Sequence, residues 1–241
     1  MKNMNFVSLL SLALILGAPI SFAAEALVRV PAPVDHVFAP KGFDTNDQTQ
    51  VIVSGYLPNL CYKNVKSEVE VMGKTVNVSV TTLKDVRPGV ICLEVMVPYL
   101  EVVTIGMLDK GEYSVVVNGN SPDGGRLTMI GVDQSVIGDV DDHIYADVES
   151  IKKTEGSRTV KLEGYLPSSC LQLDKIEAVS NGLDTYSVLP IMKQVDELCP
   201  MKLVPFSYEF KVPTELSAKQ VLLHVRALKG RSVNTLFENT K

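Results

Sequence analysis

The 241-residue sequence has no tryptophan, only three histidines and only four cysteines, and it has no excess of basic residues. Its 23 Lys and Arg are outnumbered by 28 Asp and Glu, which gives a net charge of −5 without any basic stripe. Phosphate backbones and anionic membrane surfaces attract positive charge, so the composition argues against nucleic acid and membrane surfaces as partners. Beyond the N-terminal segment, no stretch approaches the roughly 20 apolar residues of a membrane span.

Motifs that carry chemistry are also missing. The sequence contains no G-x-S-x-G nucleophile elbow, no H-E-x-x-H zinc motif, no P-loop and no C-x-x-C pair. We therefore predict that the chain is not an enzyme, has no catalytic residue and uses no cofactor. A hydrolase with an unrecognised site remains an alternative, because serines are plentiful and a triad can be assembled from distant positions.

The N-terminus is typical of an export signal. Lys2 supplies a positive charge, residues 6–20 are apolar, and Ser21-Phe22-Ala23 places small residues three and one before a cut. We expect cleavage after Ala23, with the junction after Ala24 as the alternative. The signal predicts a mature chain in the periplasm or outside the cell, without a membrane span.

One segment of the sequence occurs twice. Residues 55–61 (GYLPNLC) recur 109 residues later as residues 164–170 (GYLPSSC). An Asp-His pair precedes both copies, at His36 and His143, and both copies are followed by a second cysteine and a Val-Pro-aromatic triplet. We interpret this shared order as one module that has been duplicated.

The repeat selects one pairing of the four cysteines. Each copy holds one cysteine after GYLP and one before Val-Pro, which predicts the disulfides Cys61–Cys92 and Cys170–Cys199. The alternative is a metal site, but structural zinc prefers closely spaced Cys or His pairs, and the chain has none.

The pattern within each copy is rich in strands. Residues 75–82 alternate valine with polar residues, Ile91 to Val97 also alternate, and Asn181-Gly182 is typical of a type I′ hairpin turn. No segment of twelve or more residues shows helical periodicity. We predict an all-β protein of two tandem antiparallel, immunoglobulin-like β-sandwich domains at residues 24–131 and 132–241, each with one internal disulfide. The missing tryptophan departs from the antibody-type core.

The chain resembles an exported bacterial module of tandem immunoglobulin-like repeats with the order G-x-L-P-x-x-C, C, V-P-[FY] and G-x-Y-x-V-x-V-N-G. The second copy lacks the last of these motifs. The resemblance implies the fold and export, and it implies no activity. The first copy carries it at Gly55, Leu57, Pro58, Cys61, Cys92, Val97, Pro98, Tyr99, Gly111, Tyr113, Val115, Val117, Asn118 and Gly119. The second copy carries it at Gly164, Leu166, Pro167, Cys170, Cys199, Val204, Pro205 and Phe206.

Few polar residues stand out as ligands. His36, His143 and His224 have no metal-ligating neighbours at a suitable spacing, so we interpret them as structural. An acidic stretch at the expected domain junction suits calcium, which prefers six to eight oxygen ligands, although it lacks an EF-hand pattern. We predict no metal site, with this stretch as a weak calcium candidate through Asp139, Asp141 and Asp142.

We therefore expect a non-enzymatic binding or structural module that contacts an envelope or extracellular protein or a glycan. The contact would use a sheet edge or loops, since sandwich folds display loops on a rigid frame. The candidate loops are residues 118–126, 84–89 and 193–198. A secreted protease inhibitor is an alternative, for which Arg87 is the basic anchor, although Pro88 after it argues against ordinary cleavage.

Overall fold

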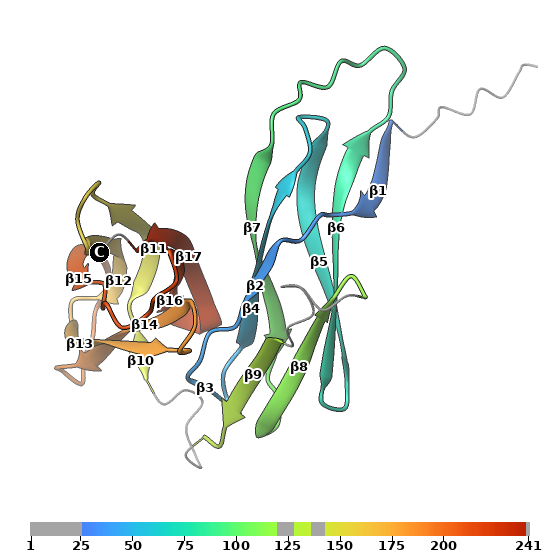
Figure 1. Cartoon of the computed structure of the whole chain (residues 1–241). Helices are drawn as coiled ribbons and strands as arrows, with labels where there is room; N and C mark the ends of the chain where they lie inside the picture. The colour runs from blue at the N-terminus through green and yellow to red at the C-terminus, as the bar shows by residue number, and fades with distance from the viewer. Residues whose placement is uncertain (1–25, 120–127, 136–142, 240–241) are drawn as a thin grey trace, which may run out of the picture.

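The computed structural model describes residues 26–119, 128–135 and 143–239, and within these ranges it is built of β-strands without an α-helix. The strands of the N-terminal half are β1 (Leu27–Pro31), β2 (His36–Phe38), β3 (Phe43–Asp44), β4 (Thr49–Leu57), β5 (Tyr62–Met72), β6 (Thr75–Asp85), β7 (Val97–Gly106), β8 (Gly111–Val117) and β9 (Thr128–Asp133). Those of the C-terminal half are β10 (Ile144–Tyr145), β11 (Asp147–Lys153), β12 (Thr159–Ser168), β13 (Leu171–Ser180), β14 (Thr185–Gln194), β15 (Met201–Lys211), β16 (Gln220–Ala227) and β17 (Arg231–Glu238), with a 3-10 turn η1 (Leu228–Gly230) before β17. The predicted fold class, all-β with two tandem sandwiches, is confirmed (Figure 1).

Each half packs a three-stranded sheet against a larger one in the described residues. In the N-terminal half the small sheet has the order β2-β4-β7, and the large sheet has the order β1-β6-β8-β9-β3 with β5 beside β6. In the C-terminal half the orders are β11-β12-β15 and β10-β14-β16-β17, with β13 beside β14. Most pairs are antiparallel, but β3–β9, β6–β8 and β14–β16 are parallel. The sequence did not predict these pairs. The last two arise because β7 and β15 cross to the opposite sheet, so the chain returns in its original direction.

The strand alternation that the sequence predicts is present where a strand has one buried face. Val76, Val78 and Val80 of β6 are at most 2% exposed, while their neighbours are not buried. Burial of apolar side chains on one face of each sheet supplies the main stabilisation of both sandwiches. The alternation over residues 91–97 was a wrong strand prediction, because the chain has no regular structure from residue 90 to 96 and β7 begins only at Val97.

The glycine that opens each GYLP segment is required by close approach of the chain. A Cβ on Gly55 would collide with the carbonyl oxygen of Pro33, and a Cβ on Gly164 would collide with that of Asp147. In both halves the colliding carbonyl belongs to the segment that runs beside the strand carrying the motif. Glycine is therefore the residue that lets these backbones approach.

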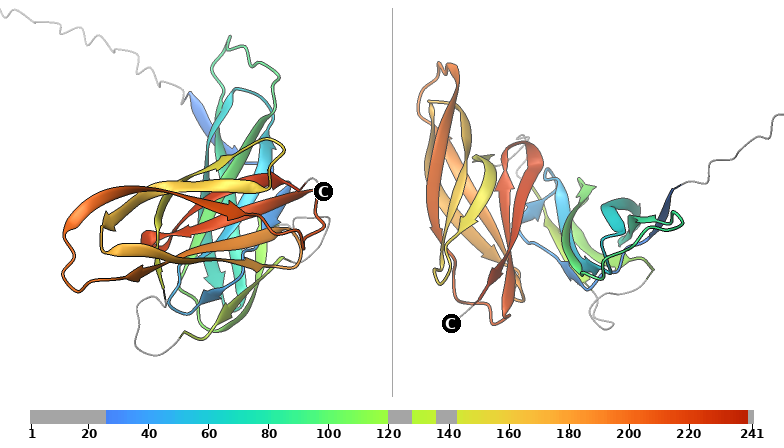
Figure 2. Two further views of the ribbon diagram at one scale, coloured as in Figure 1. Left: turned by 90° about the vertical axis from the view of Figure 1, so that its left-hand side faces the viewer. Right: turned by 90° about the horizontal axis from the view of Figure 1, so that it is seen from above.

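The two halves lie side by side, with strands of one running across those of the other (Figure 2). A small apolar cluster joins them, in which Phe38 of β2 and Ile52 of β4 pack with Leu222 of β16. These three side chains are 4%, 0% and 0% exposed. The contact, called the junction below, explains why Val51, Ile52 and Val53 of β4 are all buried, since β4 has the sandwich core on one face and the junction on the other.

The cysteines agree with the predicted pairing in one half. Cys61 and Cys92 form the predicted disulfide, with a Cα–Cα distance of 5.3 Å. The predicted Cys170–Cys199 bridge is not formed in this structure, where both residues are thiols. The Cys170 thiol donates to the carbonyl oxygen of Leu198 at 3.6 Å, and the Cys199 thiol donates to that of Asp196 at 3.2 Å. The two thiols of the second half are therefore hydrogen-bonded to the backbone of the β14–β15 connection and not joined to each other.

Candidate functional site

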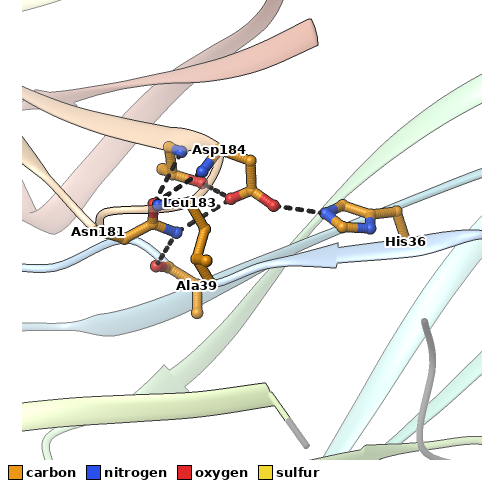
Figure 3. Close-up of polar contacts among 6 residues, drawn as sticks. His36, Ala39, Asn181, Leu183 and Asp184 are labelled. Carbon is orange, nitrogen blue, oxygen red and sulfur yellow. Dashed lines mark hydrogen bonds and ion pairs between the residues drawn. The ribbon is translucent and has the colours of Figure 1, made fainter. Parts of the chain in front are cut away.

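Two polar groups from opposite halves meet at the junction. Nε2 of His36, on β2, lies 2.7 Å from Oδ2 of Asp184, which precedes β14 (Figure 3). The side chains are 34% and 17% exposed, so the pair is partly shielded from water. Burial acts to raise the pKa of Asp184, but hydrogen bonds from His36, Asn181 and Thr185 outweigh it and hold that pKa below its ordinary value.

The turn before β14 fixes the position of Asp184. Oδ1 of Asn181 accepts hydrogen bonds from the backbone N–H groups of Leu183, Asp184 and Thr185 at 2.9, 2.9 and 3.0 Å. Its Nδ2 donates to Oδ1 of Asp184 at 3.0 Å and to the carbonyl oxygen of Ala39 at 3.2 Å. Gly182 has positive φ and Asn181 does not, so the predicted type I′ turn is wrong. Asn181 instead organises the turn through its side chain and attaches it to the N-terminal half.

A cavity of about 310 Å³ lies beside this pair, and we call it the junction pocket. Both halves contribute to its walls, through β2, β4 and β7 on one side and through the start of β16 and the end of β17 on the other. The phenol of Tyr99 donates to the carbonyl oxygen of Pro33 at 2.5 Å. Burial, and then the charges of Asp35 and Glu101, raise the pKa of Tyr99 to about 12. The pocket is lined by Asp35, His36, Phe38, Ser54, Gly55, Tyr56, Pro98, Tyr99, Asp184, Ala218, Gln220 and Leu236.

A second polar contact across the junction is centred on Arg226 of β16. Its Nη1 lies 2.9 Å from Oδ2 of Asp47, and its Nη2 donates to the carbonyl oxygen of Gly42. The guanidinium carbon lies 4.4 Å from the centre of the Phe43 ring. The Arg226 side chain is 7% exposed and that of Asp47 is 15% exposed, so this is a buried ion pair with a cation–π contact.

The histidines have three different environments. His36 lies in the junction pocket, His143 is exposed, and His224 is 1% exposed beside the Phe43 ring. Nδ1 of His224 is 2.8 Å from Oδ1 of Asn234. Burial lowers the pKa of His224 to about 3; the hydrogen bond to Asn234 opposes this shift, and the charge of Arg226 adds to it. His224 is therefore a neutral structural residue at neutral pH.

Acidification is expected to destabilise the protein through His224. Its pKa is about 3 in the folded state, against 6.5 for the ordinary group, so the unfolded state binds the proton first. The contribution of neutral His224 to the free energy of unfolding is fully present above about pH 6.5. Below that pH the free energy of unfolding falls by up to about 1.4 kcal/mol per pH unit as the pH drops toward 3. Urea unfolding followed by circular dichroism at several pH values measures this slope. His224→Asn should flatten it, whereas the same change at exposed His143 should not.

The remaining residues that the sequence analysis named are the calcium candidates, the loop 118–126 and Arg87. The calcium candidates Asp139, Asp141 and Asp142 lie outside the described residues, as does most of the loop 118–126. Within the residues that the structure describes, no group of three or more His, Cys, Asp or Glu side chains could hold a metal ion. Arg87 donates to both carboxylate oxygens of Asp85 and lowers the pKa of Asp85 to about 2.

Exposed apolar side chains gather at the connections that carry the second cysteine of each half. In residues 86–96, called tip 1, Ile91 is 87% exposed and Leu93 is 60% exposed, and Val95 and Met96 are also exposed. Tip 1 joins β6 to β7 at the upper end of the N-terminal half in Figure 1. In residues 195–203, called tip 2, Leu198 is 88%, Met201 96% and Leu203 69% exposed.

Tip 1 is held to the sandwich by two contacts among its apolar residues. The Cys61–Cys92 disulfide lies between Ile91 and Leu93, and the backbone N–H of Leu60 donates to the carbonyl oxygen of Leu93 at 3.2 Å. The candidate loop 84–89 overlaps the start of tip 1, but the sequence analysis did not predict that the apolar residues after it form a surface. Their alternation predicts a half-buried strand, whereas Ile91, Leu93, Val95 and Met96 are exposed.

The sequence analysis identified His36 but did not connect it to Asp184, and it did not single out Arg226. Contacts between residues 148 and 179 positions apart leave no local pattern in the sequence.

Among known proteins, residues 51–124 are similar to the family described as the ORF11 beta-sandwich domain. No curated protein and no solved structure matches the chain. The similarity covers β4 to the end of β8 and supports a β-sandwich in the N-terminal half.

Proposed function

We propose that the chain is a non-enzymatic, exported binding module that contacts a partner protein through tip 1 and tip 2. The observation that carries the proposal is the set of apolar side chains that tip 1 exposes around a disulfide. Soluble folded domains rarely expose a group of large apolar side chains, and where they do, the group commonly marks a site of interaction with another protein. A tethered segment also loses less conformational freedom on binding than a free loop.

The chemistry of the tips favours protein over glycan. Ile91, Leu93 and Leu198 are aliphatic, and aliphatic surface is buried well by another apolar protein surface but offers no hydrogen bonds to sugar hydroxyls. The protease-inhibitor alternative is weaker, because Arg87 is already bonded to Asp85 through its side chain and its backbone N–H. A hydrolase is weaker too, because the sequence contains no G-x-S-x-G nucleophile elbow.

Export is supported by chemistry that persists in oxidising compartments. The Cys61–Cys92 disulfide is of this kind, and it agrees with the signal expected at residues 1–23, which lie outside the described residues. Across the described part of the chain, no helix combines the length and apolar character that crossing a membrane requires.

Replacing Ile91 and Leu93 together with serine should abolish partner capture. Two central apolar anchors typically contribute at least 1 kcal/mol each, so we expect capture from envelope and culture-supernatant fractions to fall at least about tenfold. Both side chains are exposed, so the free energy of unfolding should stay within about 0.5 kcal/mol of the original. Immobilised wild-type and variant chains compared by mass spectrometry measure the effect.

The matched control is Val71→Ser with Met72→Ser. These side chains are 40% and 57% exposed and lie at the end of β5, just before the β5–β6 turn, at the other end of the N-terminal half from tip 1 (Figure 1). If the control loses the same species as the tip 1 variant, general surface stickiness explains capture and the proposal fails. Leu198→Ser with Met201→Ser tests tip 2 in the same way.

A further inference from the structure

The junction pocket is separate from tip 1 and tip 2, and the proposed function assigns it no role. Its volume of about 310 Å³ is at the lower end of the range for small-ligand sites. It is formed by both halves, with Ser54 and Tyr56 of β4 facing Gln220 and Leu236 of the C-terminal half. An occupant would therefore contact the two halves at once.

The charges around the pocket have one sign. Asp35 is exposed at the wall, Asp184 is the other lining carboxylate, and neither lysine nor arginine lines the pocket. His36 is the one lining residue that can carry positive charge, and it is paired with Asp184. The raised pKa of Tyr99, to which Asp35 and Glu101 contribute, reports the same negative surroundings. An anionic ligand would be repelled, and a cationic one attracted.

The aromatic residues add a second preference. Tyr56 is 47% exposed, and Phe38 and Tyr99 also line the pocket. Aromatic faces attract ammonium groups by about 0.5–1 kcal/mol at exposed sites. A carboxylate beside aromatic rings is thus suited to an ammonium head on a short alkyl chain, whose methylenes can pack on Leu236 and Ala218.

We propose that the junction pocket binds an organic ammonium group, either the side chain of a lysine or a free alkylamine. Asp35 supplies the carboxylate, Tyr56 supplies the aromatic face, and the His36–Asp184 pair holds the two walls together. This site is independent of the tips, so failure of either proposal leaves the other standing.

The test is a titration of residues 24–241, labelled with ¹⁵N and followed by NMR. The probes are n-butylammonium, N-acetyl-lysine N-methylamide, and the neutral and anionic analogues n-butanol and butyrate. We expect both ammonium compounds to shift the amide resonances of Ser54, Tyr56 and Gln220 in a saturable way, and butanol and butyrate to leave them unchanged. Tighter binding of the lysine derivative identifies a partner side chain as the source, and tighter binding of butylammonium identifies a free amine.

Two variants with a control decide the assignment. Asp35→Asn should weaken ammonium binding about tenfold, as expected for loss of a charge-assisted contact, and Tyr56→Leu should weaken it about two- to fivefold. Asp109→Asn removes the same charge outside the pocket and should have little effect. The proposal is overturned if butanol shifts the same resonances as strongly, if Asp109→Asn weakens binding as much as Asp35→Asn, or if no probe shifts them at tens of millimolar.

Discussion

Replacing Arg226 with methionine is expected to lower the free energy of unfolding by about 3–5 kcal/mol. Methionine keeps most of the volume but leaves the Asp47 carboxylate, 15% exposed, without its cation. The carbonyl of Gly42 loses its donor, and the Phe43 ring loses its cation–π contact. All three partners belong to the N-terminal half while Arg226 belongs to β16, so the loss falls on the contact between the halves.

Urea unfolding followed by circular dichroism measures this effect, since the chain has no tryptophan to report by fluorescence. Arg226→Met should also make the transition less steep or split it, because two weakly coupled halves unfold less cooperatively than one unit. Asp47→Asn combined with Arg226→Met should recover part of the loss, because no charge is then left buried and unpaired.

Lys161→Met is the matched control for an ion pair on the surface. Nζ of Lys161 on β12 lies 3.9 Å from Oε1 of Glu209 on β15, and the two side chains are 52% and 68% exposed. Exposed pairs contribute about 0–1 kcal/mol, so this variant should barely move the unfolding midpoint. Equal losses from Arg226→Met and Lys161→Met would show that the Arg226 contact contributes no more than a surface pair, and the account of the junction would be wrong.

Local patterns in the sequence predict the strands that have one buried face and one solvent-exposed face. Residues 75–82 alternate as β6 requires. The same rule fails in β14, whose residues 185–192 are all buried, because its outer face is covered by neighbours outside the sandwich core. Period-two alternation reports one solvated face, and a strand covered on both faces has none.

The candidate site depends on which residues meet across the junction, and single-sequence patterns do not contain that information. His36 was visible through its repeated Asp-His context, but its counterpart His143 is exposed and takes no comparable place. Asp184 lies between a turn and a strand and looks like an ordinary turn residue until Asn181 is seen to orient it. The duplicated sequence thus led us to expect equivalent roles at positions where the contact between halves creates different ones.

Removing the Cys61–Cys92 disulfide by replacing both residues with alanine is expected to cost about 3–4 kcal/mol. The bridge closes a loop over a sequence separation of 31, and the chain-entropy model gives a cost of this size for releasing a loop of that length in the unfolded state. The folded state is affected as well, because tip 1 loses its covalent attachment beside Leu93. We therefore expect the alanine variant to lose partner capture in addition to stability, measured by urea unfolding and by the same capture assay.

The pair Cys170 and Cys199 provides the internal control. It occupies the corresponding positions of the second half, 29 residues apart against 31 in the first half, but it is in a different chemical state. Both are thiols in the structure, so alanine at both positions removes only packing and weak hydrogen bonds, at a cost of about 1–2 kcal/mol. The neighbouring Cys170 thiol raises the pKa of the Cys199 thiol, which makes Cys199 a poor nucleophile in the native protein. Alkylation should therefore be slow until urea is added, and should then modify two thiols without reductant. A count of zero, together with a loss of 3–4 kcal/mol for the Cys170 and Cys199 alanine variant, would contradict the dithiol state and show that both halves are bridged alike.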